Sequence, residues 1–233
     1  MASTAPAPPE GPGPLEIVER RRAVALAGHT DDIDGVRRGL TDPAPAVRAT
    51  AWSALARLGM LDPTGVRTAL ADHAAEVRTR ACELAARPFP PGKGGEEIAP
   101  QRDGQEIHRG VVDRLCQAVH DESATVAEAA CFALGELGAA DSSGAAVPTL
   151  VGAAGGHADP LVREAAVAAL GAIGDPSGLP AILAATSDKP AVRRRAVLAL
   201  APFDGPDVDT ALQRALTDRD WQVRQAAEDM TGT

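Results

Sequence analysis

Apolar positions recur along this chain at the spacing of an amphipathic helix, and the pattern returns six times. Each copy opens with a valine, and the typical copy has further apolar residues four, seven, eight and eleven positions later. At about 100° per residue, these positions fall on one side of a helix. The opening valines, called anchors below, are Val47, Val77, Val126, Val162, Val192 and Val223. Successive anchors lie 30, 49, 36, 30 and 31 residues apart, so the period is about 30 residues with one large and one small insertion.

The residues around each copy predict where its helix begins and ends. Asp159-Pro160 is typical of a helix start, because the aspartate accepts hydrogen bonds from unpaired amides and proline presets φ. An aspartate also stands five positions before the anchor in four copies, as Asp42, Asp72, Asp121 and Asp218. Glycine follows the last apolar residue at Gly59, Gly138 and Gly174, where we predict left-handed helix caps.

A second, shorter helical pattern precedes each anchored copy, as in GLPAILAA before Val192. Two helices per 30 residues form a hairpin that cannot bury its apolar face alone, whereas a stack of hairpins can. We therefore predict an all-α fold, a right-handed α-solenoid of about six helical hairpins in a single domain over residues 15–233. The end units should be polar caps, and the first helix, Leu15 to Ala27, should carry its ERRR segment on the outer side.

Two segments fall outside this pattern. Residues 1–14 are rich in Pro, Ala and Gly and lack the basic and apolar regions of a signal peptide, so we expect a disordered tail. A long Pro/Gly-rich loop is predicted at about 88–106, between the second and third anchored copies. A loop of this length is either a binding element or a disordered excursion.

Composition and charge narrow the partners. Aromatic residues are few, with two Trp, three Phe and no Tyr, which favours helices over strands. The chain has a net charge of −9, and residues 88–158 alone carry 10 acidic and 4 basic groups. Negative charge of this kind repels phosphate backbones, which argues against nucleic acid as the main partner. The three cysteines show no paired spacing, as expected in a reducing cytoplasm. The Arg, Ala and Gly bias suggests a bacterial genome, and no apolar run is long enough to span a membrane.

The unit GLPAILAATSDKPAVRRRAVLALAPF resembles the HEAT repeat, especially the PBS-lyase HEAT-like form. The shared features are a proline early in the first helix (Pro148, Pro180), an aspartate between the helices, a Val-Arg opening and an Ala-Leu-Gly close. The resemblance covers roughly residues 31–230. It implies a solenoid whose second helices line a concave surface, but the fold by itself hosts many activities.

An arginine follows the anchor in most copies, at Arg48, Arg78, Arg163, Arg193 and Arg224. We interpret these arginines as a structural ladder in which each one pairs with an inter-helix aspartate of its own or the next repeat. The alternative is a basic stripe for an anionic ligand, but a ligand-binding residue need not repeat with the period. Ala127 interrupts the series in the most acidic part of the chain.

Positions opposite the apolar side of each anchored helix are expected on the concave surface. Phe132 stands there among small and acidic neighbours and has no evident core role, unless rotation between repeats tucks the ring under an adjacent helix. Glu128 and Glu164 accompany it in two neighbouring units, while Trp52 is a borderline case. The candidate partner-binding residues are Phe132, Glu128, Glu164, Trp52, Arg194 and Leu198.

No motif in the chain indicates catalysis, and we expect no catalytic residue, metal or cofactor. The five histidines show no metal-binding spacing. Deoxyhypusine hydroxylase, a HEAT-like enzyme, carries paired His-Glu motifs on its repeat helices. The matching positions here are Ala127-Glu128 and Arg163-Glu164, which contain no histidine, so the resemblance does not imply that activity.

We therefore predict a non-enzymatic scaffold or adaptor that binds a protein partner, with a basic segment, through its concave face. The alternative is a PBS-lyase-like protein acting as a lyase or chaperone on a bilin or another small molecule. Cys82 and Cys131 share one helical offset in adjacent units, which packing explains equally well. The oligomeric state stays open.

Overall fold

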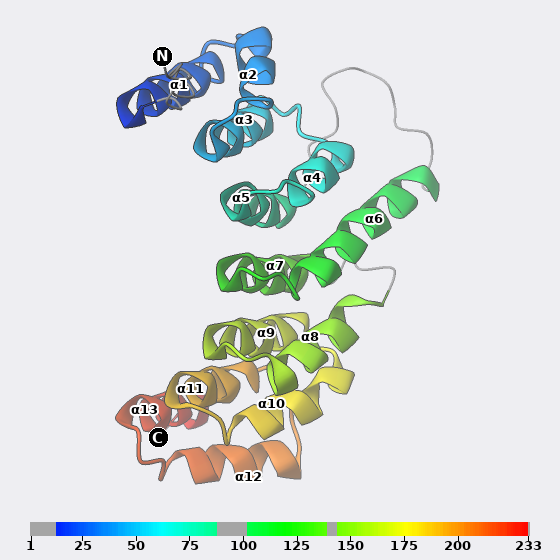
Figure 1. Cartoon of the computed structure of the whole chain (residues 1–233). Helices are drawn as coiled ribbons and strands as arrows, with labels where there is room; N and C mark the ends of the chain where they lie inside the picture. Colours follow the sequence, from blue (N-terminus) through cyan, green and yellow to red (C-terminus); the bar gives the residue numbers. More distant parts are fainter. Residues whose placement is uncertain (1–12, 88–101, 139–143, 233) are drawn as a thin grey trace, which may run out of the picture. The chain divides into compact units, whose positions relative to one another are not determined.

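The computed structural model describes residues 13–87, 102–138 and 144–232, with no description of the side chains of 101–108. Within these ranges the chain is helical and contains no strand, which confirms the all-α prediction (Figure 1). None of the described helices is both long and apolar enough to cross a membrane. The chain divides into two compact units, residues 1–60 and 61–233, and each is described by itself. The prediction of a single domain over 15–233 stays a prediction.

The first unit contains α1 (Pro14–Ala27), α2 (Ile33–Gly39) and α3 (Pro45–Arg57). α1 packs against both α2 and α3, with Val24, Val36 and Val47 buried. Asp32 caps α2 by accepting a hydrogen bond from the Gly35 amide at 2.9 Å. The unit is therefore one helical hairpin, α2 and α3, preceded by a single helix.

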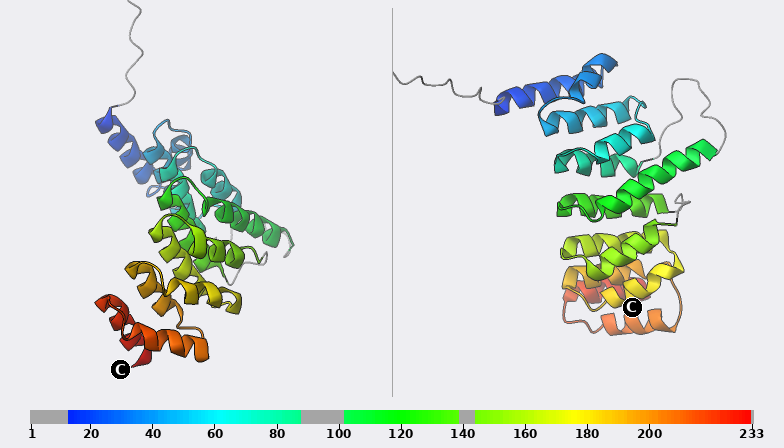
Figure 2. Two further views of the ribbon diagram at one scale, coloured as in Figure 1. Left: turned by 60° about the horizontal axis from the view of Figure 1, so that its bottom comes forward. Right: turned by 45° about the vertical axis from the view of Figure 1, so that its right-hand side comes forward.

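The second unit contains five hairpins in succession. Their first helices are α4 (Pro63–Leu70), α6 (Arg102–Ala118), α8 (Ala146–Gly156), α10 (Leu179–Ala185) and α12 (Pro206–Ala215). Their second helices are α5 (Ala75–Ala85), α7 (Ala124–Leu137), α9 (Pro160–Ile173), α11 (Pro190–Ala199) and α13 (Trp221–Thr231). A short 3-10 helix, η2 (Pro176–Gly178), leads into α10. The first helices form one layer and the second helices another, as Figure 1 and the further views of Figure 2 show.

The repeat predicted from the sequence is the repeat of the core. All six anchor valines are buried, with at most 1% of their surface exposed. Within the second unit, successive second helices also pack against each other, so α5, α7, α9, α11 and α13 touch in series. Six hairpins among the described residues agree with the predicted number.

The helix ends follow the sequence signals with two exceptions. Asp159 caps α9 by accepting the Leu161 amide at 2.8 Å, and Gly59 and Gly174 have the predicted positive φ of 68° and 70°. Gly138, however, keeps a right-handed conformation with φ −50°. A side chain at Gly138 would collide with that of Ile173, so close packing of α7 on α9, rather than a left-handed turn, requires this glycine.

The second exception concerns the long insertion. α6 already begins at Arg102, so the loop predicted to reach about residue 106 ends earlier. The rest of that loop, residues 88–101, lies outside the described residues, as does most of the predicted tail, residues 1–12.

Candidate partner-binding site

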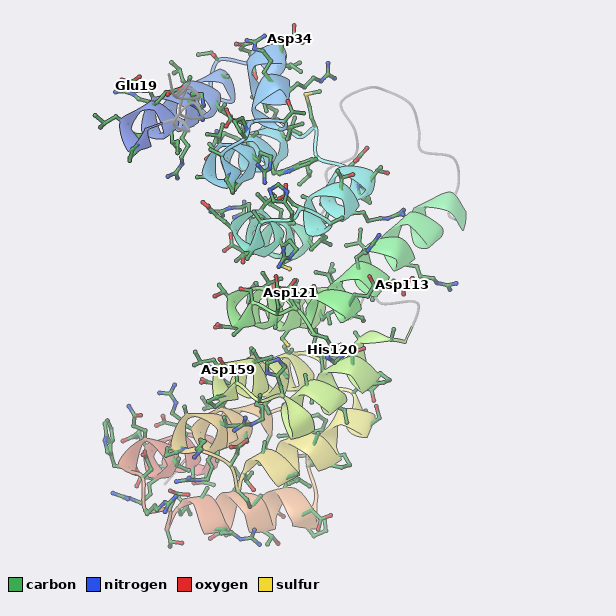
Figure 3. The ribbon with its side chains drawn as sticks, viewed as in Figure 1. Glu19, Asp34, Asp113, His120, Asp121 and Asp159 are labelled. Atoms are coloured by element: carbon green, nitrogen blue, oxygen red, sulfur yellow. The ribbon has the colours of Figure 1, made fainter. Side chains whose placement is uncertain are left out.

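The anchor-following arginines form a ladder of ion pairs between successive second helices. Arg78 of α5 donates to both carboxylate oxygens of Asp121, at 2.7 and 2.8 Å, and Asp121 lies just before α7 (Figure 3). Arg163 binds Asp188 in the same bidentate way at 2.7 and 2.8 Å, and Arg193 binds Asp218 at 2.9 and 2.7 Å. Each arginine therefore reaches the aspartate of the next repeat. Bidentate geometry fixes direction as well as charge.

The same arginines also fasten their own repeat. Arg78 donates through Nη1 to the backbone carbonyls of Asp72 and His73 at 3.0 Å, in the turn that precedes α5. Arg224 donates to the Asp218 carbonyl at 2.7 Å, and Arg48 donates to the Asp42 and Pro43 carbonyls at 2.9 and 3.1 Å. These bonds satisfy turn carbonyls that no helix uses. The ladder interpretation is thus supported by the ion pairs of Arg78, Arg163 and Arg193, and Arg48 and Arg224 share the bonds to turn carbonyls.

The aspartates complete the joint by holding the turn itself. Asp121 accepts the Ser123 amide at 2.9 Å, and Asp218 accepts the Asp220 amide at 2.8 Å. Hydrogen bonds from Arg163 and Arg193 hold the pKa of Asp188 and Asp218 below the ordinary carboxyl value. Burial alone would raise the pKa of Asp121, but the hydrogen bonds from Arg78 and Ser123 lower it overall.

The ladder is interrupted between α7 and α9. Ala127 occupies the arginine position and is fully buried, and His157 occupies the position five before the anchor Val162. His157 still holds the turn, because its Nδ1 accepts the Asp159 amide at 3.1 Å. Here the helices meet through small residues, since a Cβ on Gly135 would lie 3.0 Å from both Cα and Cβ of Ala169. The same kind of close packing occurs where the ion pair is present, because a Cβ on Gly171 of α9 would lie 2.7 Å from both Cα and Cβ of Ala199 on α11. The α7–α9 junction therefore keeps the packing and lacks the ion pair.

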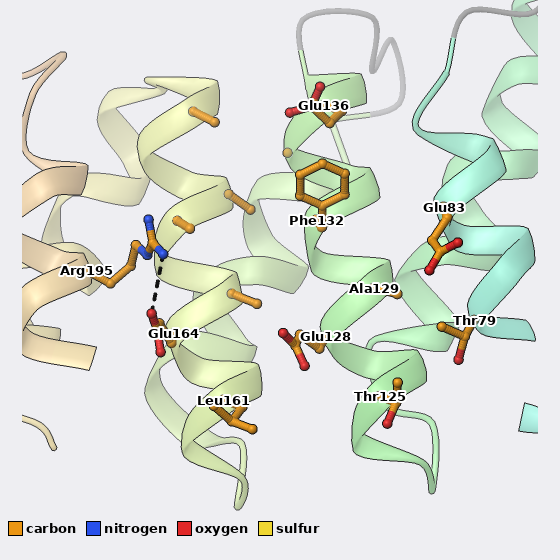
Figure 4. A pocket seen from close by; sticks show the side chains of 15 residues that line it. Thr79, Glu83, Thr125, Glu128, Ala129, Phe132, Glu136, Leu161, Glu164 and Arg195 are labelled. Atoms are coloured by element: carbon orange, nitrogen blue, oxygen red, sulfur yellow. Dashed lines mark hydrogen bonds and ion pairs between the residues drawn. The ribbon is translucent and has the colours of Figure 1, made fainter. Parts of the chain in front are cut away.

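A groove of about 600 Å³ runs across the second helices on either side of this junction. Phe132 and Glu128 of α7 rise from its wall, with Glu128 pointing toward α9 (Figure 4). Much of the floor is formed by alanines of α9. The groove, as named below, is lined by Thr79, Glu83, Thr125, Glu128, Ala129, Phe132, Gly135, Glu136, Leu161, Glu164, Ala165, Ala168, Ala169, Ala172 and Arg195.

The charges of the groove are mostly negative. Glu128 and Glu136 are exposed, and among the described residues neither carboxylate has an ion-pair partner. Glu164 differs, because Arg195 donates to it at 3.4 Å and Arg194 lies 3.9 Å away (Figure 4). The α7 side of the groove therefore carries uncompensated negative charge, while at the α11 side the charge of Glu164 is neutralised.

The structure brings three of the predicted binding residues together and separates the others. Phe132, Glu128 and Glu164 all line the groove, and Phe132 is 56% exposed, which confirms that the ring is not part of the core. Arg194 and Leu198 lie on α11 outside the groove lining, with Leu198 38% exposed.

The expectation that Trp52 lies on an accessible face is wrong. Its side chain is only 8% exposed. The same helical offset, five after the anchor, is occupied by Cys82, Cys131, Val167 and Val197, and all of these are buried too. Within the second unit the offset is a core position because α7, α9 and α11 each have another second helix on both sides.

Sequence reasoning missed Leu161, Glu136 and Arg195. Their offsets from the anchor are −1, 10 and 3, and at 100° per residue they place the centre of the groove face near ~240° rather than the ~200° expected. Burial at offset five turns the accessible face in this direction. Leu161, 55% exposed, was recognisable as an apolar residue just outside the repeating apolar set.

The two cysteines that share a helical offset are not arranged for covalent chemistry. Cys82 and Cys131 are fully buried, and burial raises the pKa of each thiol to about 12. A thiol with such a pKa stays protonated at neutral pH, whereas the thiolate is the nucleophile. In the described part of the chain, no three His, Cys, Asp or Glu residues are grouped so that they could hold a metal ion.

Comparison with known families agrees with the observed repeats. The profile of the HEAT repeats matches residues 112–188, and that of the PBS lyase HEAT-like repeat matches residues 192–218. Together these matches identify residues 112–218 as HEAT repeats. No curated protein sequence matches the chain significantly.

Solved structures with similar folds are repeat proteins of low sequence identity. The Escherichia coli protein YibA is 18% identical, with a TM-score of 0.59, and the match covers 95% of this chain and 76% of YibA. A designed armadillo repeat protein is 17% identical with a TM-score of 0.55, covering 84% and 97% of the two chains. Another, computationally designed for modular peptide recognition, is 16% identical with a TM-score of 0.54, covering 93% and 99%. At these identities the likeness concerns the fold, an α-solenoid.

Proposed function

We propose that this HEAT-repeat protein is a non-enzymatic scaffold that binds a segment of a protein partner in the groove of α5, α7 and α9. The observation that carries the proposal is Phe132, a large aromatic side chain that is 56% exposed inside a groove lined mostly by small and acidic residues. An aromatic ring held on a rigid helix is a typical hot spot for binding. The proposal is also supported by the designed armadillo repeat protein of similar fold, which was designed for modular peptide recognition.

The negative charge of the groove indicates which kind of partner segment would bind there. Glu128 and Glu136 lie on α7 one turn before and one turn after Phe132, so they flank the ring. A partner segment with an apolar side chain between lysines or arginines would pack on the ring and meet both carboxylates. Such complementarity raises the association rate more than it raises affinity. Glu164 contributes less than the sequence suggested, because Arg195 already binds it.

The setting of this function is part of the same proposal. The excess of negative charge, the cysteine usage and the Arg-rich composition support a cytoplasmic protein of a bacterium. A basic protein segment, rather than a nucleic acid, is the complementary partner.

Selection of peptides against the intact protein tests the proposal. A library of random 12-residue peptides should yield binders with one large apolar residue flanked by basic residues. Phe132→Ala should weaken such a peptide about 5- to 30-fold, equivalent to 1–2 kcal/mol, as measured by calorimetry. The matched control is Trp221→Ala, because Trp221 is 65% exposed but lies outside the groove lining, and this change should leave affinity unaltered.

Charge and stability measurements complete the test. Glu128→Lys should slow association most at low salt, whereas Asp113→Lys, on the exposed surface of α6, should have little effect. Melting curves should be nearly unchanged for Phe132→Ala. If Phe132→Ala unfolds the protein, or if it leaves the affinity of the selected peptides intact, the groove is not the binding site.

A further inference from the structure

The first helix, α1, exposes a stripe of apolar side chains. A helix that caps a repeat array is expected to have a polar outer side instead. Leu15 is 81% exposed, Val18 57% and Leu26 60%, although the sequence predicted a charged outer side. With Arg22, these residues fall within an arc of about 80° on α1. Leu15 and Leu26 are 11 residues apart, or about three helical turns, so the stripe runs straight along the helix. The opposite side of α1, with Val24 and Ala27, packs within the first unit.

The charged residues beside the stripe are not used inside the unit. Arg20 is occupied, since it binds Glu16 at 2.7 Å and Asp42 at 2.9 Å. Glu19 and Arg22 are exposed, and within the described ranges neither forms an ion pair (Figure 3 labels Glu19). The stripe is therefore apolar at both ends, with one acidic and one basic group near its centre.

This arrangement complements a second copy of itself. If two α1 helices pack antiparallel about a twofold axis between Arg20 and Arg21, Leu15 faces the partner's Leu26. The same axis brings Glu19 opposite the partner's Arg22. Because a twofold interface is isologous, each of these contacts occurs twice.

A parallel arrangement of the two helices lacks this match. It would place Arg22 near the partner's Arg22 and Glu19 near the partner's Glu19, so like charges would face each other. Charge complementarity thus selects the antiparallel pair.

We propose that α1 is a homodimerisation surface through which two copies of this chain pack antiparallel. A single helix pair buries less than a standard-size interface, so the dimer is weak, with a dissociation constant of about 10–100 μM. This surface lies on the first unit and is independent of the groove, which lies on the second. Dimerisation and peptide binding are therefore tested separately.

Sedimentation equilibrium of the full chain, from about 1 to 500 μM, measures the association. Wild type should pass from monomer to dimer over this range. Arg22→Glu and Glu19→Arg should each weaken the dimer at least about tenfold, because each turns two opposite-charge contacts into like-charge contacts. Arg21→Glu is the matched control, since Arg21 is also exposed on α1 but lies off the stripe, and it should change the association little.

Exchanging the charges of Glu19 and Arg22 gives the decisive experiments. The double variant Glu19→Arg/Arg22→Glu should dimerise like wild type. An equal mixture of the two single variants should form a heterodimer, because every Arg then faces a Glu. Circular dichroism checks that all variants are folded.

A wild-type chain that stays monomeric up to 500 μM overturns the proposal, whether residues 1–12 or a different protein covers the stripe. It is also overturned if Arg21→Glu weakens the dimer as much as Arg22→Glu, or if neither the double variant nor the mixture restores association.

Discussion

Two kinds of junction join the second helices in the second unit, and they differ in whether an Arg–Asp ion pair connects the two repeats. Between α9 and α11, Arg163 and Asp188 form a bidentate ion pair, and each is also bonded to turn backbone. Between α7 and α9 the arginine position is the buried Ala127. Close glycine–alanine packing is common to both junctions, with Gly135 on Ala169 in one and Gly171 on Ala199 in the other. The groove with its exposed Phe132 is centred on this second junction.

The difference shows that the second helices pack against each other without the ion pair, so the ladder acts on the turn before each second helix. Where the ion pair is absent, the turn is still held by His157, and the helices still touch. Partly buried ion pairs recover little net energy after desolvation, although breaking one by removing a single partner is costly. The pairs are therefore best understood as devices that fix the register of one repeat on the next.

The largest effect is expected from the core that underlies both junctions. Val162 of α9 is fully buried, so Val162→Asp places an unpaired carboxylate in an apolar site and should cost about 3–5 kcal/mol. Urea unfolding followed by circular dichroism measures the loss. The adjacent Leu161→Asp is the control, because Leu161 is 55% exposed, and it should cost less than about 1 kcal/mol. Equal losses for the two variants would mean that the repeat register is wrong.

Removing a rung of the ladder should have a smaller effect. Arg163→Ala leaves Asp188 without its partner and should destabilise by about 1–3 kcal/mol, as should Asp188→Ala. The double variant should lose less than the sum, with a coupling of at least about 1 kcal/mol. Arg80→Ala is the control, because its partner Glu83 lies on the exposed surface. Additive losses at Arg163 and Asp188 would contradict the ladder.

Installing the missing rung sharpens the comparison further. Ala127→Arg alone buries a guanidinium without a carboxylate and should destabilise the protein, whereas Ala127→Arg/His157→Asp should recover that loss and add up to about 1 kcal/mol. Thermal unfolding of the four chains gives the coupling. A double variant no better than Ala127→Arg alone would show that position 157 is not the next rung.

The smallest effect is the pH dependence of the ladder. The pKa of Asp188 and of Asp218 is lowered in the folded protein, so the unfolded chain binds more protons and stability falls as pH decreases. The free energy of unfolding should be level above pH 5 and should decline through and below the ordinary carboxyl value of 3.8. Asp188→Asn removes one of these carboxylates and should show a shallower decline in urea unfolding at pH 3–7. An unchanged slope would contradict the assignment.

The sequence by itself determined the features that repeat. The period, the six hairpins, the buried anchor valines and the Arg–Asp ladder all follow from local signals that recur with each unit: apolar spacing, turn aspartates and the position of one arginine. The break at Ala127 was also visible. The position of Phe132 opposite the apolar side of its helix favoured an exposed ring, and the structure excluded the alternative that a neighbouring repeat covers it.

Only the tertiary structure decided what depends on neighbours. A helical wheel has one buried centre, but a second helix in a stack is packed by the helix before it and the helix after it. In the second unit this second contact turns the groove toward Leu161 and Glu136 and makes Gly138 a packing residue. In the first unit Trp52 is buried as well. α1 shows the opposite effect, since no helix precedes it in the described part of the chain. Its apolar stripe of Leu15, Val18 and Leu26 is exposed.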